Sequence, residues 1–173
     1  MKIKLDIACR NFLIPYIIRV WPRYKEAKHL MLIAKHLQAV EQGKIKRLII
    51  AMPPRHGKSL TLSEFFPAWY MGRNPTHQII FSTYGQKLAS GFGRKVRNQM
   101  NDPIFRYLFP KCRISQDSKS KNEFSTTEGG VYIAGGRGGS LTGKGANLAI
   151  LDDLIKDQEE AQSESVREGL KDW

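Results

Sequence analysis

Short runs of apolar residues alternate along the chain with longer stretches in which apolar positions recur every three or four residues. Three runs rich in branched side chains, residues 47–51, 78–82 and 147–151, are typical of strands buried on both faces of a sheet. Helical spacing marks residues 25–42, and residues 85–100 are predicted to form a helix with a basic face. Because strands alternate with helices, we expect an α/β fold with a mainly parallel sheet flanked by helices.

The remaining segments have a less regular pattern. Residues 123–126 and 131–134 flank a Thr-Glu-Gly-Gly sequence, which predicts a β-hairpin. The following residues, 135–145, contain six glycines and are expected to form a loop. The polar residues from 156 onward are predicted to be helical.

Length and composition fit a folded domain. The chain has 173 residues, of which 41% are hydrophobic and 25% are charged, so disorder is not the expected state. This length is enough for one domain with a sizeable core. We assign residues 1–24 to an N-terminal arm that contains some helix, and residues 25–173 to one domain.

The charge of the chain is strongly basic and unevenly distributed. The net charge is +12 and the isoelectric point is about 9.9. Residues 156–173 carry three basic and six acidic side chains, whereas residues 1–155 carry 25 basic and 10 acidic ones. Such a basic field favours a polyanionic partner, commonly nucleic acid, although solubility alone is the simpler explanation.

Cysteine usage and hydropathy exclude several protein classes. Cys9 and Cys112 form neither a CxxC pair nor a dense framework, so we expect no zinc site and no disulfide, and a reducing cytoplasmic location. The longest early apolar run, residues 12–18, is far shorter than the roughly 20 residues of a membrane span. Asp6 interrupts any signal-peptide pattern, so neither membrane insertion nor export is expected.

Residues 52–59 read Met-Pro-Pro-Arg-His-Gly-Lys-Ser, and they follow a predicted strand and precede a predicted helix. The phosphate-binding P-loop has this context and the pattern G-x-x-x-x-G-K-[ST]. Gly57, Lys58 and Ser59 match its last three positions, while Met52 replaces the first glycine. The alternative is a helix start that binds no ligand.

The residue types of this loop suit Mg²⁺-ATP. Backbone N–H groups of such a loop point at the phosphates, and Lys58 would place its charge on the β- and γ-phosphates. The Ser59 hydroxyl would help to hold Mg²⁺. The residues expected to bind the nucleotide are Met52, Pro53, Pro54, Arg55, His56, Gly57, Lys58 and Ser59.

The third apolar run ends in two carboxylates, Asp152 and Asp153. P-loop ATPases need an acidic residue at the end of a neighbouring buried strand to hold Mg²⁺, and Asp152 supplies it. Asp153 stands where many ATPases have a glutamate that polarises the attacking water. A strand that ends in a polar turn is the alternative, and the combination with the P-loop is the specific signal.

Three separated segments together resemble phage and prophage terminase large subunits. They are residues 52–59, the Phe-Ser-Thr-Tyr-Gly-Gln-Lys-Leu-Ala-Ser sequence of residues 81–90, and the Gly-Ser-Leu-Thr-Gly-Lys-Gly-Ala-Asn-Leu-Ala-Ile-Leu-Asp-Asp sequence of residues 139–153. The resemblance runs from about residue 25 to the C-terminus. It implies a P-loop NTPase fold of the RecA-like (ASCE) class. In the P-loops of terminases the first glycine is often replaced, as it is here by Met52.

The resemblance also implies a function. The ATPase domain of this family drives double-stranded DNA into a preformed capsid, as a homo-oligomeric ring on the portal protein, alongside a small terminase subunit. A nuclease domain follows the ATPase domain in the family. Because the chain ends at Trp173, we expect the ATPase domain to be truncated at its C-terminal end and its sheet to be incomplete. A phage or prophage protein of this kind is expected in the host cytoplasm.

Carried over residue by residue, the resemblance assigns catalytic roles to Lys58, Asp153 and Arg55, the last acting on the γ-phosphate. It assigns the metal to Ser59 and Asp152. For Arg137, in the glycine-rich loop, two interpretations stay open. It is either a trans-acting arginine that reaches the nucleotide of the next subunit, or a residue of a flexible surface loop.

Two other functions remain compatible with the motifs. One is a different P-loop enzyme, such as a helicase-like ATPase or a small-molecule kinase. The other is a catalytically inactive terminase remnant that binds nucleotide or DNA without turnover. DNA-stimulated ATP hydrolysis separates the packaging motor from both.

Overall fold

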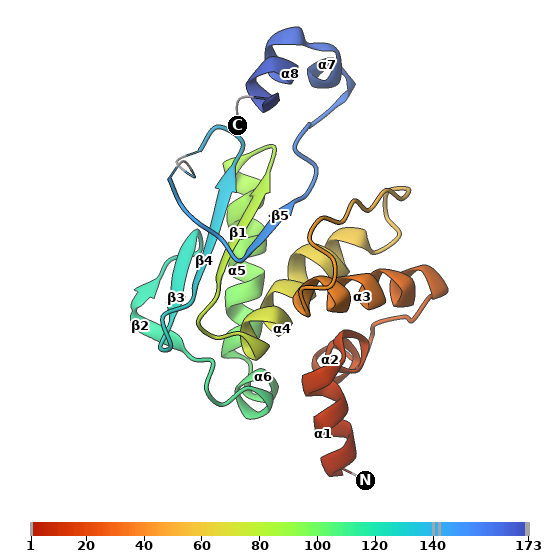
Figure 1. Cartoon of the computed structure of the whole chain (residues 1–173), viewed down its shortest axis with the longest axis vertical. Coiled ribbons are helices and arrows are strands. Elements are labelled where there is room, and N and C mark those ends of the chain that lie inside the picture. Colours follow the sequence, from red (N-terminus) through yellow and green to blue (C-terminus); the bar gives the residue numbers. More distant parts are fainter. Residues whose placement is uncertain (1, 140, 142, 172–173) are drawn as a thin grey trace.

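A computed structural model describes residues 2–139, 141 and 143–171. Five strands of this part of the chain form one sheet flanked by helices, a mixed α/β architecture (Figure 1). The order of the strands in the sheet is β2-β3-β4-β1-β5. The strands are β1 (Gln78–Thr83), β2 (Ile114–Lys119), β3 (Glu123–Thr126), β4 (Val131–Gly136) and β5 (Leu148–Leu151).

The sheet is half parallel and half antiparallel. β1 pairs in parallel with β4 on one side and with β5 on the other, which confirms the predicted strands at 78–82 and 147–151. β3 pairs antiparallel with β4, which confirms the predicted hairpin, and β2 extends it by another antiparallel pairing. The expectation of a mainly parallel sheet therefore holds only for β4-β1-β5, because hairpin-connected strands must run antiparallel.

Helices lie before, between and after the strands, and those predicted at 25–42 and 85–100 are confirmed as α3 and α5. No helix of the described residues is long and apolar enough to cross a membrane. The helices are α1 (Lys2–Asn11), α2 (Leu13–Val20), α3 (Lys28–Glu41), α4 (Phe66–Arg73), α5 (Gln86–Asn101), α6 (Pro103–Leu108), α7 (Gln158–Gln162) and α8 (Glu164–Lys171), and the π-helix η1 (Leu60–Phe65) directly precedes α4.

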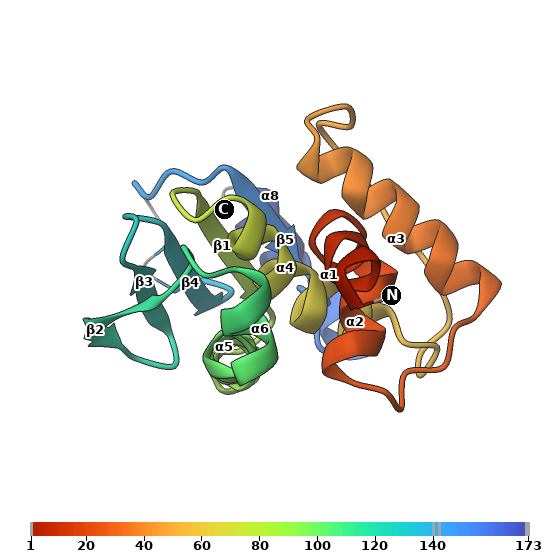
Figure 2. The ribbon, with the colours of Figure 1, turned by 90° about the horizontal axis from the view of Figure 1, so that it is seen from below.

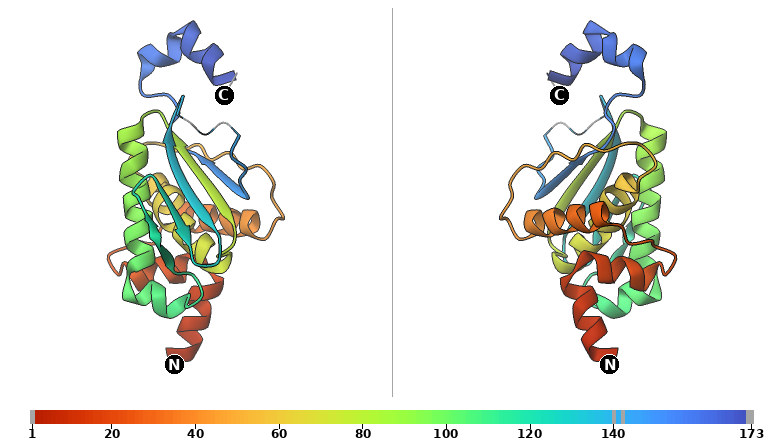
Figure 3. Two further views of the ribbon diagram at one scale, coloured as in Figure 1. Left: turned by 90° about the vertical axis from the view of Figure 1, so that its left-hand side faces the viewer. Right: turned by 90° about the vertical axis from the view of Figure 1, so that its right-hand side faces the viewer.

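The helices are distributed unevenly around the sheet. α5 lies along one of its faces (Figure 3). α1, α2 and α3 gather beside α4, away from the β2 edge (Figure 2). α7 and α8, which confirm the helix predicted after residue 156, project from the end of the molecule opposite the N-terminus (Figure 1).

The core joins the N-terminal helices to the sheet layer. Leu13, Tyr16 and Ile17 of α2 are completely buried, as are Trp69 of α4 and Phe81 of β1. The indole Nε1 of Trp69 donates a hydrogen bond to the backbone oxygen of Cys9 in α1, over 3.2 Å. Residues 1–24, which the sequence suggested as an arm, thus contribute to the same buried cluster as the rest of the chain.

The strand predicted at residues 47–51 is absent, and that prediction was wrong. The segment is irregular and belongs to no strand of the sheet. Leu48 and Ile50 are half-buried against the core, while Ile49 between them is 94% exposed. Buried and exposed side chains therefore alternate along the segment, as they do in an extended chain. The segment has no strand to pair with, since the free edge of β5 pairs with no described segment.

The helix after the loop begins as predicted near Ser59, but its first part is the π-helix η1. Pro67 lies in the first turn of α4, directly after the π turns. A proline has no N–H to donate, and in a regular α-helix its ring would clash with the carbonyl four residues earlier. The wider π turns give the helix a change of register at this point, and the helix continues through the proline.

Both cysteines are free and buried, which agrees with the expectation of no disulfide.

Burial raises the pKa of the Cys112 thiol to about 12. At pH 8 its reactive thiolate fraction is then about 10⁻⁴. We predict that Cys112 of the native protein reacts with a maleimide at least about 100-fold more slowly than in the urea-unfolded chain. Mass spectrometry of the labelled peptide checks this, and equal rates in both states would contradict the buried position.

Candidate functional site

The predicted phosphate loop encloses a cavity of about 450 Å³. Its position follows from the fold, because the loop precedes η1 and the carboxyl end of β5 supplies the facing wall. Of the residues expected to bind the nucleotide, all but His56 line this cavity. The lining residues are Met52, Pro53, Pro54, Arg55, Gly57, Lys58, Ser59, Leu60 and Asp153.

Two residues with positive φ shape the loop. Gly57 has φ 88°, and a Cβ on it would lie 3.2 Å from Leu30 Cδ2, so both conformation and packing favour glycine. Arg55 has φ 62°, an uncommon conformation for a residue with a side chain, and such strain often occurs at functional sites. The ring Nδ1 of His56 lies 2.7 Å from the Pro54 oxygen, so this side chain bonds to the loop itself.

Lys58 joins the loop to both carboxylates. Its Nζ lies 2.9 Å from Asp153 Oδ1 and 3.0 Å from Asp152 Oδ1. Partial burial lowers the pKa of Lys58, but the two neighbouring carboxylates outweigh burial and raise the pKa above its usual value. The lysine is therefore held as a cation between two residues that lie 94 and 95 positions away in the sequence.

Asp152 is a buried carboxylate with an available oxygen. Its side chain is 3% exposed, and Oδ2 accepts a hydrogen bond of 2.6 Å from the hydroxyl of Ser63. Oδ1 is buried and accepts no hydrogen bond, and its partner is the Lys58 ammonium in an ion pair. A carboxylate oxygen that is balanced by a cation alone fits a Mg²⁺ ligand.

The site offers few protein ligands for a metal. No group of three or more His, Cys, Asp or Glu side chains within residues 2–139, 141 and 143–171 is arranged to hold an ion. Mg²⁺ in nucleotide sites keeps several waters and uses one or two protein oxygens plus substrate phosphates. Asp152 and Ser59 match this sparse requirement.

Asp153 differs from Asp152 in exposure and backbone. Its side chain is 60% exposed, and its φ of 49° is unusual for a residue other than glycine. The end of β1 holds this conformation, because the Tyr84 N–H and the Thr83 hydroxyl both donate to the Asp153 backbone oxygen, over 3.0 Å and 3.2 Å. The exposed carboxylate faces the same cavity as the loop.

The two candidate arginines lie in different places. Arg55 is exposed and lines the cavity. Arg137 follows β4, and its Nη1 donates to the Leu154 oxygen and to Glu160 Oε2, each over 3.1 Å. The structure thus brings Arg55 to the loop cavity, whereas Arg137 holds the segment between β5 and α7.

Reasoning from the sequence did not identify Ser63, Thr83 or Tyr84. The signal for Ser63 was its position one helical turn after Ser59, on a helix that had to lie against the carboxylate strand. Thr83 and Tyr84 lie at the carboxyl end of β1, where ligands commonly bind in open α/β sheets. No sequence pattern marks them, because their contacts are with the backbone oxygen of Asp153.

A comparison with protein families adds an independent finding. A family model described as "Terminase large subunit, T4likevirus-type, N-terminal" matches residues 49–173, more than two thirds of the chain. The match includes the loop, both carboxylates and the connecting sheet. Neither a search of curated proteins nor a search of solved structures gave a significant match.

Proposed function

Because the chain belongs to the T4-like family of terminase large subunits, which serves phage DNA packaging, we propose that it is the ATPase motor part of such a subunit. In this proposal, Mg²⁺-ATP hydrolysis drives double-stranded DNA into the viral capsid. Residues 25–173 form the P-loop, RecA-like domain, and residues 1–24 are its N-terminal extension.

One observation carries the proposal. Lys58 of the loop meets Asp152 and Asp153 at the end of β5, at 3.0 Å and 2.9 Å. Phosphoryl transfer needs little covalent chemistry from the protein and depends on positioned charge. A loop lysine beside a buried and an exposed carboxylate provides cationic and anionic groups at one cavity.

Each residue of the site has a role in hydrolysis. Lys58 leaves the carboxylates when ATP binds and neutralises charge that builds up on the β- and γ-phosphates. Asp153, exposed and close to the cavity, orients the water that attacks the γ-phosphorus as the bond to the β-phosphate breaks. Arg55 contacts the γ-phosphate through charge-assisted hydrogen bonds.

Ser59 and Asp152 would hold Mg²⁺, which would supply positive charge against the phosphates when it is bound. Backbone N–H groups of residues 56–59, at the start of the helix, bind phosphate oxygens. Met52, Pro53 and Pro54 form the apolar wall of the cavity next to these groups. In this proposal, the Lys58 side chain moves to the phosphates when ATP binds, whereas the Asp152 carboxylate keeps its position.

The proposed partners follow from the family. They are double-stranded DNA, the portal protein and the small terminase subunit, with a homo-oligomeric ring as the assembly. The excess of basic residues over positions 1–155 suits the DNA backbone. In such a ring Arg137 would act on the neighbouring nucleotide only after it leaves Glu160.

A second function, nucleotide binding without turnover, is favoured by one observation. Residues 47–51, which lead into the loop, lie outside the sheet, and no strand of the described residues pairs with the edge of β5 next to Asp152. A loop anchored on one side only would bind phosphate through its backbone but would position the reacting groups less firmly.

Steady-state phosphate release by the purified protein, with Mg²⁺-ATP and with or without double-stranded DNA, tests the proposal. We expect hydrolysis that DNA stimulates several-fold and that EDTA abolishes. Binding of a fluorescent ATP analogue without any phosphate release would support the second function instead. Absence of both binding and hydrolysis would overturn the nucleotide site itself.

A further inference from the structure

The helix that follows the phosphate loop is a π-helix, η1, over Leu60–Phe65. The π-helix is rare and occurs mostly as single-turn bulges, often at functional sites. In η1 the buried side chains alternate with less buried ones, so that Thr61, Ser63 and Phe65 point into the protein. Two of these buried residues carry hydroxyl groups, and their partners differ.

Ser63 bonds to the carboxylate that the P-loop lysine also contacts. It is completely buried, and its Oγ donates to Asp152 Oδ2 over 2.6 Å. This is a short, charge-assisted hydrogen bond to a carboxylate that is itself 3% exposed. Ser59, the serine of the P-loop pattern, makes no such bond in the described part of the chain. The residue that orients Asp152 is therefore one turn further along than the sequence pattern indicates.

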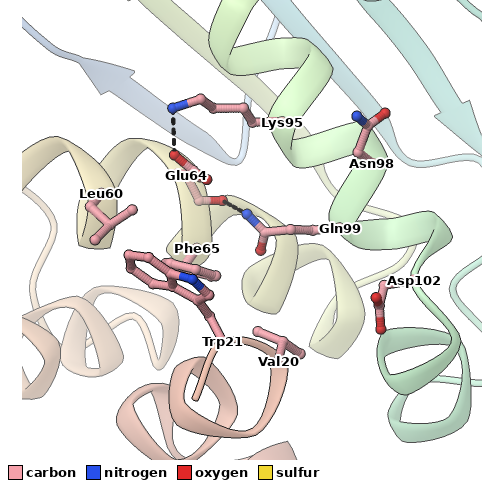
Figure 4. A pocket seen from close by; sticks show the side chains of 9 residues that line it. All are labelled: Val20, Trp21, Leu60, Glu64, Phe65, Lys95, Asn98, Gln99 and Asp102. Carbon is pink, nitrogen blue, oxygen red and sulfur yellow. Dashed lines mark hydrogen bonds and ion pairs between the residues drawn. The ribbon is translucent and has the colours of Figure 1, made fainter. Parts of the chain in front are cut away.

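α5 supports η1 from the other side. Lys95 Nζ lies 2.8 Å from Glu64 Oε2, and Gln99 Nε2 donates to the Glu64 backbone oxygen over 3.1 Å (Figure 4). The second bond satisfies a carbonyl within the π-helix, where regular helical pairing is interrupted. Trp21 stacks on Phe65 with ring centroids 5.8 Å apart, and it borders the same hollow of about 330 Å³ (Figure 4). η1 is thus held at Glu64 and Phe65, the two residues that follow Ser63.

We propose that Ser63 is a positioning residue, which fixes the Asp152 carboxylate for Mg²⁺ through a hydrogen bond that the π turns of η1 make possible. This inference rests on the proposed function. When Lys58 moves to the phosphates, Asp152 loses the ion pair on Oδ1. The Ser63 bond on Oδ2 remains, and it keeps Oδ1 directed at the metal. Partners of this kind, one step behind a metal ligand, commonly change metal affinity 10- to 100-fold.

The test is a Mg²⁺ titration of fluorescent-ATP binding, with hydrolysis as a second readout. For Ser63→Ala we expect the Mg²⁺ midpoint to rise about 10-fold, with nucleotide affinity at saturating Mg²⁺ within about threefold of wild type. Ser63→Cys, whose thiol is slightly larger than the hydroxyl and donates only weakly, is expected to shift the midpoint in the same direction. Circular dichroism establishes that both variants are folded.

Thr61→Val is the matched control. Thr61 is as buried as Ser63 and lies on the same π-helix, but its hydroxyl bonds to the Tyr24 hydroxyl over 3.0 Å and not to a carboxylate. This variant should keep the wild-type Mg²⁺ midpoint.

The outcomes separate the two proposals. If wild type binds nucleotide in a Mg²⁺-dependent way and folded Ser63→Ala has the same midpoint within twofold, the positioning role is wrong and the proposed function stands. An equal shift in Thr61→Val would also overturn it, since the effect would then belong to η1 in general. If wild type binds no nucleotide at any Mg²⁺ concentration, the proposed function fails, and the role of Ser63 with it.

Discussion

Replacing Lys58 by alanine is expected to lower the rate of ATP hydrolysis by about 10²- to 10³-fold, because removal of one preorganised donor at a transition state costs this much. Lys58 is the cation that lines the loop cavity and contacts both carboxylates. Without the lysine, no ammonium group balances the negative charge of the phosphates or that of Asp152. Phosphate release at saturating Mg²⁺-ATP, with and without DNA, measures the effect.

The same variant has a second expected consequence. Without Lys58, Asp152 Oδ1 is a buried carboxylate oxygen without a partner, so the free energy of unfolding should fall by about 1–3 kcal/mol. Lys35→Ala is the control, since Lys35 is exposed on α3 and should change neither quantity. Hydrolysis by Lys58→Ala at the wild-type rate would overturn the assignment of this loop as the catalytic P-loop.

Much of the site could be predicted because its parts are local in sequence. The glycine before Lys58 is required by a positive φ, and the pattern of residues 52–59 encodes that requirement directly. Asp152 follows a run of branched apolar residues, so its place at the end of a strand was implied by hydropathy, but the expected burial on both faces was wrong because Ala149 and Leu151 of β5 are exposed. The meeting of loop and carboxylates does not follow from shared strand ends, because residues 47–51 lie outside the sheet, and it rests on the contacts of Lys58 with Asp152 and Asp153.

The errors and omissions have tertiary causes. Residues 47–51 have strand-forming side chains, but a strand requires a hydrogen-bonding neighbour, and the free edge of β5 does not pair with them. The π-helix could not be foreseen, because no sequence pattern marks it and its contact at the Glu64 oxygen comes from Gln99 of α5. Ser63 was missed because its bond to Asp152 is a tertiary contact between residues 89 positions apart.

Trp69→Ala is expected to reduce the free energy of unfolding by about 3–5 kcal/mol, the usual cost of removing a large aromatic side chain from a core. Trp69 is completely buried, and the Arg73 guanidinium lies 5.1 Å from the ring centroid. Its Nε1 also donates to the Cys9 oxygen in α1. Urea unfolding followed by circular dichroism measures the loss, and hydrogen exchange in α1 should accelerate in the variant.

Two control variants separate the contributions of this side chain. Trp69→Phe keeps most of the apolar volume but removes the hydrogen bond to Cys9, so we expect a smaller loss, near 1–2 kcal/mol. Leu32→Ala, at a position 57% exposed, should lower the free energy of unfolding by less than about 0.5 kcal/mol.

If the free energy of unfolding of Trp69→Ala lies within about 1 kcal/mol of the wild-type value, the contact between α1 and α4 does not persist in solution. Residues 1–24 would then be a separable arm, as the division at residue 24 suggested. A large loss would instead mean that the rest of the fold requires these helices, because they cover the only completely buried tryptophan among the described residues.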